Sequence, residues 1–292
     1  MTKEQLLHKF GSLSVWEKEG RRAPHKPLMV LLALSNLQKG NRWLYFKEID
    51  RHVKDLLKTY GRPSKSCHPE YPFWWLQSDG IWEVHEGDSL QRRKGKSNEP
   101  LRGELVRNNT EAGFSQEVAE VLHRRPEWIA AVARLLLDSH FPESLHQEIA
   151  DSVGLEMEKE GAVACYGFFR ETVLRTYQHR CAICGYDLKI GCADFGLEAA
   201  HIKWRAAGGP DTVNNGLSLC ALHHKAFDLG AITLTLNYRI MVSEHVYGTK
   251  HLETHLLAYI GKPILDPLKA AYLPQHGFIE WHQQEVFRSP NR

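Results

Sequence analysis

The chain has 292 residues, of which 42% are hydrophobic and 25% charged, a composition typical of soluble globular proteins and a length that suits about two domains. No stretch approaches the roughly 18 uninterrupted apolar residues that a membrane helix needs, and the N-terminus has no apolar signal region, so we expect a cytoplasmic protein without membrane contact. The net charge is only +2, but residues 1–116 hold 20 Lys and Arg against 14 Asp and Glu, whereas the remainder holds 17 against 21. This basic N-terminal part favours contact with a polyanion.

Helices are predicted for most of the N-terminal segment, and an aromatic hairpin follows them. The three expected helices span 4–10, 24–38 and 46–59. The second is apolar nearly all round, which predicts a core helix, and the third is amphipathic. The segment YPFWWLQSDGIWEV, residues 71–84, has two aromatic, strand-like runs around a Ser-Asp-Gly turn. Helices followed by a hairpin resemble a winged-helix arrangement, so we expect a helical, winged-helix-like domain here.

A basic loop at residues 91–99 separates that hairpin from two further helices, the second of which is expected to begin near Pro126. Helical periodicity is then lost and Glu and Gly become frequent, which is typical of a connection between domains. We therefore expect a first domain at 1–145, a linker at 146–162 and a second domain at 163–292.

The second domain is expected to place a cysteine-rich unit between short secondary-structure elements. A helix should begin near Tyr166, and the segment LEAAHIKW, residues 197–204, is strand-like. The segment AITLTLNYRIMV, residues 231–242, predicts a hairpin that turns at Asn237 and Tyr238. The chain as a whole is therefore predicted to be an α+β protein.

Two pairs of metal-binding residue types occur with the same spacing. Cys181 and Cys184 form one pair, and Cys220 and His223 form a second pair that begins 36 residues after Cys184. In a cytosolic protein, such pairs are more typical of metal binding than of disulfides. Three cysteines and one histidine make a closed tetrahedral set, so we predict a structural zinc ion on these four residues. An alternative set uses His224 in place of His223.

The segment between and after these pairs carries a specific resemblance. The motif GGPD, followed by NGLSLCALHH, resembles the signature of the HNH, or ββα-metal, nucleases in their zinc-containing subclass, over about residues 166–235. The resemblance implies that His201 is the general base, that Asn215 braces the loop near it, and that His224 binds a catalytic divalent ion, Mg²⁺ or Mn²⁺. It also favours His223 as the zinc ligand, because a cysteine often occupies that position in the family.

These residue types suit hydrolysis of a DNA phosphodiester. A neutral imidazole, with an ordinary pKa of about 6.5, accepts a proton from water near neutral pH, and a divalent cation stabilises charge on the leaving oxygen. Many HNH enzymes have Asp or His directly before the base as a second metal ligand, but this chain has Ala200. Glu198 shares a strand face with that position and is a candidate ligand. Asp228, ordered water or an inactive nuclease fold are the alternatives.

Two N-terminal segments carry a second resemblance. The turn RRAPHKPL and the run YPF resemble the sulfur-binding domain that precedes HNH modules in type IV restriction endonucleases, which cleave phosphorothioate-modified DNA. The resemblance covers about residues 10–140. Sulfur is larger and more weakly hydrated than the phosphate oxygen that it replaces, so a shallow apolar cup would favour it. The expected DNA contacts are Arg21, Arg22, His25, Lys26, Tyr71, Pro72, Phe73, Arg92, Arg93, Lys94 and Lys96.

Together these features predict a modification-dependent restriction endonuclease that binds phosphorothioated double-stranded DNA and hydrolyses it at a one-metal HNH site. Two alternatives stay open: an HNH endonuclease that reads methylated or hydroxymethylated cytosine, and a zinc-stabilised DNA-binding protein that does not cleave. Because cutting both strands needs two active sites, we expect a homodimer. The tail at 253–292, with Trp281 and Phe287, is a candidate interface.

Overall fold

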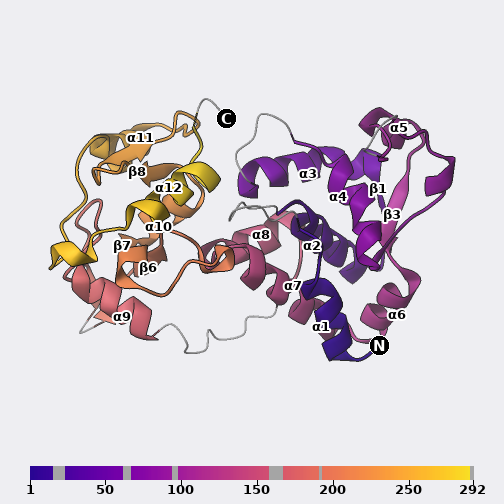
Figure 1. The fold of residues 1–292 in the computed structure, drawn as a ribbon, viewed down its shortest axis with the longest axis horizontal. Coiled ribbons are helices and arrows are strands. Elements are labelled where there is room, and N and C mark those ends of the chain that lie inside the picture. Colours follow the sequence, from indigo (N-terminus) through magenta and orange to yellow (C-terminus); the bar gives the residue numbers. More distant parts are fainter. Residues whose placement is uncertain (16–23, 62–66, 94–97, 158–166, 191–192, 290–292) are drawn as a thin grey trace. The chain divides into compact units, whose positions relative to one another are not determined.

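The computed structural model describes residues 1–15, 24–61, 67–93, 98–157, 167–190 and 193–289. The chain divides into two compact units, Met1–Lys159 and Glu160–Arg292 (Figure 1). No helix in these described ranges is long and apolar enough to cross a membrane. Each unit is described by itself below.

The first unit is mostly helical. Its α-helices are α1 (Lys3–Gly11), α2 (His25–Gln38), α3 (Phe46–Tyr60), α4 (Glu70–Trp75), α5 (Arg102–Arg107), α6 (Gln116–Arg124), α7 (Glu127–His140) and α8 (His146–Val153). Its three short strands form an antiparallel sheet in the order β1-β3-β2, and they are β1 (Trp43–Tyr45), β2 (Trp82–Val84) and β3 (Glu111–Phe114).

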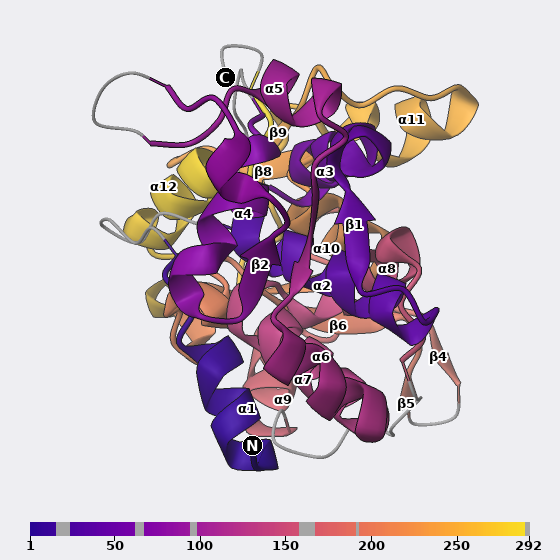
Figure 2. The ribbon, with the colours of Figure 1, turned by 90° about the vertical axis from the view of Figure 1, so that its right-hand side faces the viewer.

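Helix α2 lies in the core of the first unit. Every residue from Pro27 to Ser35 is buried. A helix that is apolar on all sides needs other elements around it, and α3, α4, α7 and α8 pack against α2 (Figure 2). The core helix predicted at 24–38 is therefore confirmed, as are the helices predicted at 4–10 and 46–59.

The hairpin predicted for residues 71–84 is wrong in its first half. Helix α4 ends at Trp75, a 3₁₀ turn follows at Leu76–Asp79, and only β2 is a strand. Strand β2 pairs with β3 and not with a neighbouring aromatic run, so these residues do not form the expected wing. Pro72 explains the difference, because it lies in the first turn of α4, where its missing N–H is not needed, whereas it would interrupt a strand ladder.

The helical conformation of α4 decides which aromatic side chains reach the surface. Phe73 is fully buried, with its ring centroid 4.9 Å from that of Phe46, and its carbonyl accepts a hydrogen bond from Trp82 Nε1 at 2.9 Å. Tyr71 is half-buried, and Trp75, one helical turn later, is 39% exposed. Phe73 is thus a core residue and does not line a DNA-facing cup.

The first unit extends into the segment expected to be a linker. Residues 146–153 form α8, which packs against α2. Ser35 donates a hydrogen bond to the Gly154 carbonyl at 2.7 Å, and Gln38 makes two hydrogen bonds with the backbone of Glu156, each of 3.0 Å. These contacts tie the chain to α2 as far as Glu156, so the boundary expected at residue 145 lies too early. The amphipathic pattern of α8 is short, which hid it in the sequence.

The second unit combines short β-hairpins with helices. Its strands are β4 (Lys189–Ile190), β5 (Ala193–Asp194), β6 (Leu197–His201), β7 (Gly216–Cys220), β8 (Ile232–Leu234) and β9 (Ile240–Val242). Its α-helices are α9 (Gly167–Thr176), α10 (Ala221–Asp228), α11 (Lys250–His255) and α12 (His276–Glu285).

Strands β6 and β7 and helix α10 form the predicted ββα arrangement. The two strands pair antiparallel from Leu197 opposite Cys220 to His201 opposite Gly216, and α10 follows β7 directly. Helix α9 packs on both strands. The hairpin predicted after this unit is confirmed as β8 and β9, and Tyr238 in its turn has a φ of 56°.

The C-terminal tail belongs to the core of its own unit. Trp281 is 8% exposed and packs edge-on against Trp204, with ring centroids 5.9 Å apart. His282 is fully buried between Thr233 and the Phe227 carbonyl, with hydrogen-bonding distances of 2.8 Å and 3.1 Å. Trp281 and Phe287 are therefore covered by the same chain, and they do not form the exposed interface expected for them.

We predict that Phe73→Ala lowers the free energy of unfolding of the first unit by about 3–5 kcal/mol, because it removes a fully buried ring from a packed core. Trp75→Ala, on the same helix but on its outer face, should change it by less than about 1 kcal/mol. Urea denaturation followed by circular dichroism measures both. Similar losses for the two variants would contradict the assignment of Phe73 to the core.

Candidate active site and metal centre

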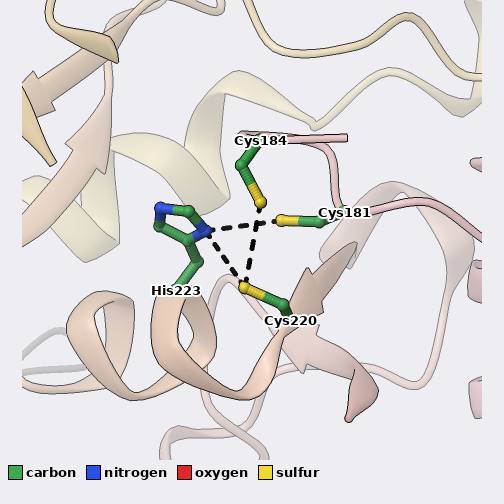
Figure 3. A group of neighbouring side chains, drawn as sticks. All are labelled: Cys181, Cys184, Cys220 and His223. Carbon is green, nitrogen blue, oxygen red and sulfur yellow. Dashed lines mark hydrogen bonds between the residues drawn. The ribbon is translucent and has the colours of Figure 1, made fainter. Parts of the chain in front are cut away.

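Four side chains predicted to bind zinc converge in the second unit. Cys181 and Cys184 come from the segment after α9, and Cys220 and His223 come from the junction of β7 and α10. Their ligand atoms all lie within 4.8 Å of one another (Figure 3). His223 Nδ1 is 3.1 Å from Cys220 Sγ and 3.6 Å from Cys181 Sγ. In a tetrahedral zinc site, metal–ligand bonds of 2.0–2.3 Å place the ligand atoms about 3.3–3.8 Å apart.

The chemistry of this donor set fits a structural zinc ion. His223 Nε2 donates a hydrogen bond to the His255 carbonyl at 2.8 Å, which directs the Nδ1 lone pair toward the sulfurs. Hydrogen bonding within the cluster lowers the pKa of Cys181 and raises the pKa of Cys184 and of Cys220. Among the described residues, this is the one group of Cys, His, Asp and Glu with such metal-ligand geometry.

His201 lies at the end of β6 in a site built by α9 and the following loop. Its ring stacks on Phe169 of α9, with centroids 4.0 Å apart. Gly216, opposite His201 on β7, makes room for this contact, because a Cβ there would come within 2.5 Å of Val173 and 3.0 Å of Phe169. His201 Nε2 lies 2.9 Å from Asp211 Oδ1.

This environment favours a neutral, oriented imidazole. Burial lowers the pKa of His201 below its ordinary value, although the Asp211 carboxylate partly opposes the effect. When the neutral ring donates its Nε2 proton to Asp211, Nδ1 is left as the acceptor. Asp211 was not predicted as a partner of His201, although the signal was present, because Asp211 is the last residue of the GGPD motif.

Asn215 braces the loop between the two strands. It is fully buried, and its Oδ1 accepts a hydrogen bond from the Lys203 N–H at 2.8 Å. Its Nδ2 donates to the carbonyls of Lys203 and Pro210 at 3.0 Å and 2.9 Å. Gly209 permits the tight packing, since a Cβ there would lie 1.8 Å from the Lys203 carbonyl oxygen. Asn215 therefore holds both ends of the loop that carries Asp211 toward His201.

His224, the next residue of α10, lies between two carboxylates. Its Nδ1 is 2.6 Å from Glu198 Oε2 on β6, and its Nε2 is 3.1 Å from Asp228 Oδ2 on α10. Burial alone would lower the pKa of His224, but the charges of Asp228 and Glu198 outweigh it and raise the pKa to about 9. The charge of Asp228 also acts on His201, where it opposes the lowering of the pKa. The two carboxylates beside His224 favour a cation at that ring.

The expected DNA contacts in the first unit are only partly placed on its surface. Arg21, Arg22, Lys94 and Lys96 lie outside the described residues. Lys26 pairs with Asp79 at 2.6 Å, and its side chain is little exposed. His25 begins α2, and Pro72 is buried.

Tyr71, Trp75 and two arginines form the accessible part of this region. Tyr71 stacks on His68, and the Arg93 guanidinium lies 6.0 Å from the Tyr71 ring centroid. Arg92 pairs with Asp88 at 2.9 Å and covers the ring of Trp74. Trp75 is an exposed aromatic residue that sequence analysis did not select, and it lines a hollow of about 360 Å³ together with Trp74 and Arg92.

Comparison with known families agrees with this division of the chain. Residues 3–158, just over half of the chain, match the family described as ScoMcrA-like, DNA sulfur-binding domain. This chain belongs to that family. Residues 181–235 match the HNH endonuclease family, a range that contains the zinc ligands, both candidate catalytic histidines and the ββα unit. The chain thus joins a phosphorothioate-DNA binding domain to an HNH nuclease domain. No curated protein matches it.

Three solved structures are similar to the sulfur-binding part of the chain. The sulfur binding domain of ScoMcrA complexed with phosphorothioated DNA is 22% identical and covers 51% of this chain and 94% of its own, with a TM-score of 0.44. The corresponding complex of SprMcrA is 20% identical, with coverage of 53% and 95% and a TM-score of 0.42. The type IV phosphorothioation-dependent restriction endonuclease ScoMcrA is 20% identical, with coverage of 54% and 35% and a TM-score of 0.43.

We predict that the second unit binds one zinc ion per chain and that Cys181→Ser loses the ion and lowers the melting temperature of this unit, because structural zinc contributes directly to folding. Elemental analysis and differential scanning calorimetry measure the two effects. Cys67→Ser, which alters a thiol of the first unit, is the matched control and should retain the zinc. A zinc-free native chain of unchanged stability would contradict the prediction.

Proposed function

We propose that the chain is a modification-dependent restriction endonuclease that binds phosphorothioated double-stranded DNA and hydrolyses it at a one-metal HNH site. The observation that carries the proposal is the pairing, within one chain, of a sulfur-binding family domain with an HNH domain whose His201 and His224 each face a carboxylate partner. A reader domain alone would not need these two oriented histidines.

In the proposed reaction, His201 accepts the proton of the attacking water at Nδ1. Asp211 holds the ring through Nε2, and Asn215 holds the loop that carries Asp211. His224 and Glu198 are the proposed ligands of a Mg²⁺ or Mn²⁺ ion, which when bound stabilises negative charge on the leaving 3′-oxygen. Glu198 takes the role that the residue before the base has in many HNH enzymes, where this chain has Ala200.

The proposed reader surface lies around the outer face of α4. Tyr71 and Trp75 present apolar surface there, and Arg92 and Arg93 lie beside them. An apolar contact favours weakly hydrated sulfur over oxygen, while the arginines attract the surrounding phosphates. Two copies of the chain on one duplex would supply an active site for each strand, so we propose that it acts as a homodimer.

We predict that the chain cleaves a duplex carrying one R_P phosphorothioate in each strand and leaves the unmodified duplex intact, with Mg²⁺ or Mn²⁺ present and with His201→Ala inactive. A gel cleavage assay on the two duplexes, and on a third with methylated or hydroxymethylated cytosine, provides the test. Equal cleavage of modified and unmodified DNA would contradict recognition of the phosphorothioate. Cleavage of the cytosine-modified duplex alone would show that the protein recognises a modified base and not sulfur. Binding of DNA without cleavage would favour the alternative of a DNA-binding protein whose HNH domain is a zinc-stabilised fold without nuclease activity.

We predict that Asp211→Asn reduces kcat by about 10- to 100-fold, because the base loses the carboxylate that orients it. Activity requires neutral His201, so it falls as the pH drops through the pKa of this group. Asp211 raises that pKa, and its loss should therefore shift the acidic limb of the pH–rate profile to lower pH. Glu280→Gln, at an exposed position of α12, is the charge-matched control. A lower rate with an unmoved acidic limb would argue against Asp211 acting through His201.

A further inference from the structure

One buried side chain outside the proposed machinery reaches His224 through a chain of hydrogen bonds. Trp204, in the loop after β6, is 2% exposed, and its Nε1–H donates to Asp228 Oδ1 at 3.0 Å. Asp228 Oδ2 lies 3.1 Å from His224 Nε2. On the opposite edge of the same ring, Nδ1 lies 2.6 Å from Glu198 Oε2. The four side chains thus form one chain of contacts from the buried Trp204 to the partly exposed Glu198.

The surroundings of the two ring nitrogens decide which proton His224 gives up when it binds an ion. Asp228 accepts from the Trp204 N–H at Oδ1 and from His224 Nε2 at Oδ2, and Glu198 accepts from Nδ1 while the ring carries both protons. Asp228 holds the Nε2 proton on the buried side of the ring, so a neutral ring keeps that proton and has its lone pair on Nδ1. Nδ1 faces the Glu198 side chain, which is 46% exposed, whereas the Asp228 side chain on the other edge is 1% exposed.

We infer that Trp204 and Asp228 are positioning residues that keep the proton of neutral His224 on Nε2, so that Nδ1 and Glu198 together face the divalent ion. The inference rests on the proposed function, because it concerns the same metal site. In this arrangement the buried Asp228 carboxylate hydrogen-bonds to the His224 ring and is not itself a ligand of the ion. Outer carboxylates that orient a ligating histidine in this way typically change metal affinity 10- to 100-fold when they are altered.

The arrangement makes an unusual prediction for Asp228→Asn. An asparagine has one acceptor oxygen and one donor NH₂ in place of two acceptor oxygens. If its oxygen accepts from Trp204, its NH₂ faces His224 Nε2, and the ring proton moves to Nδ1, where it blocks the ion. If its oxygen accepts from His224, its NH₂ meets the Trp204 N–H, and two donors face each other. Either orientation weakens metal binding.

Trp204→Phe should partly reverse this defect. The phenyl ring carries no N–H, so in the double variant the NH₂ of the introduced asparagine can turn toward position 204 while its oxygen accepts from His224 Nε2. We therefore expect Asp228→Asn to weaken Mn²⁺ binding by about 10- to 100-fold and the double variant to recover about 10-fold of that loss. Two changes that act only by disturbing the core would add their damage.

The experiment titrates Mn²⁺ into the zinc-loaded full chain and follows the free ion by electron paramagnetic resonance. Tighter binding by the double variant than by Asp228→Asn supports the inference. Equal or weaker binding by a folded double variant overturns it and would favour Asp228 as a direct metal ligand. An unaltered chain that binds no Mn²⁺, or that binds it equally well after His224→Ala, overturns the proposed metal site and with it this inference.

A single variant keeps the test decisive if the double variant does not fold. Trp204→Phe alone keeps Asp228 but removes the hydrogen bond that orients its carboxylate. We expect this variant to bind Mn²⁺ several-fold more weakly, as is typical when a group that orients a metal ligand is altered. Trp281→Phe, which removes an indole from the same aromatic contact without touching this hydrogen bond, is the matched control and should bind Mn²⁺ like the unaltered chain. Equal Mn²⁺ affinity of the two folded single variants would overturn the inference.

Discussion

The candidate site of the HNH domain depends on the first turn of α10, where two adjacent histidines face different surroundings. Successive residues of a helix point about 100° apart, so His223 and His224 cannot serve one metal ion. The zinc ligands Cys181 and Cys184 tie the segment after α9 to the start of α10 through His223. That attachment fixes the rotation of the helix, and the rotation places His224 between Glu198 and Asp228. On the proposed function, the four-residue cluster that fits a structural zinc thereby orients a catalytic site that shares none of its ligands.

Sequence spacing predicted most of this site, because its parts are close in the chain. The two pairs of zinc ligands, the strand that ends at His201 and the histidine after His223 are all local patterns. Asp211 and Trp204 were not predicted as partners, because their roles depend on how the loop closes. Asn215 holds that loop, and only the closed loop shows that Asp211 reaches His201. A motif thus identifies ligands more readily than the residues that orient them.

The N-terminal domain was less predictable, because aromatic runs fit a strand and a helix equally well. In a strand, residues 71, 73 and 75 would share one face, and Phe73 would be exposed beside Tyr71. In α4, by contrast, residues 71 and 75 share a face, while Phe73 and Trp74 turn into the core. The change of period removes Phe73 from the outer surface and leaves Tyr71 and Trp75 there. Only the conformation around Pro72 separates the two interpretations.

On the proposed function, recognition of modified DNA and cleavage reside in different domains, and the cleavage depends on the recognition because one chain joins the two domains. His201, His224 and their partners suit the phosphodiester and an ion, which are common to all DNA, so selectivity for modified DNA falls to the sulfur-binding domain. One sulfur atom offers a limited contact, since burying a single group of this size contributes about 1–3 kcal/mol. Joining the two domains in one chain makes the second encounter intramolecular, at an effective concentration that reaches about the millimolar range for short connections. A weak nuclease site can then remain inactive on ordinary DNA and still cut efficiently where the reader is bound.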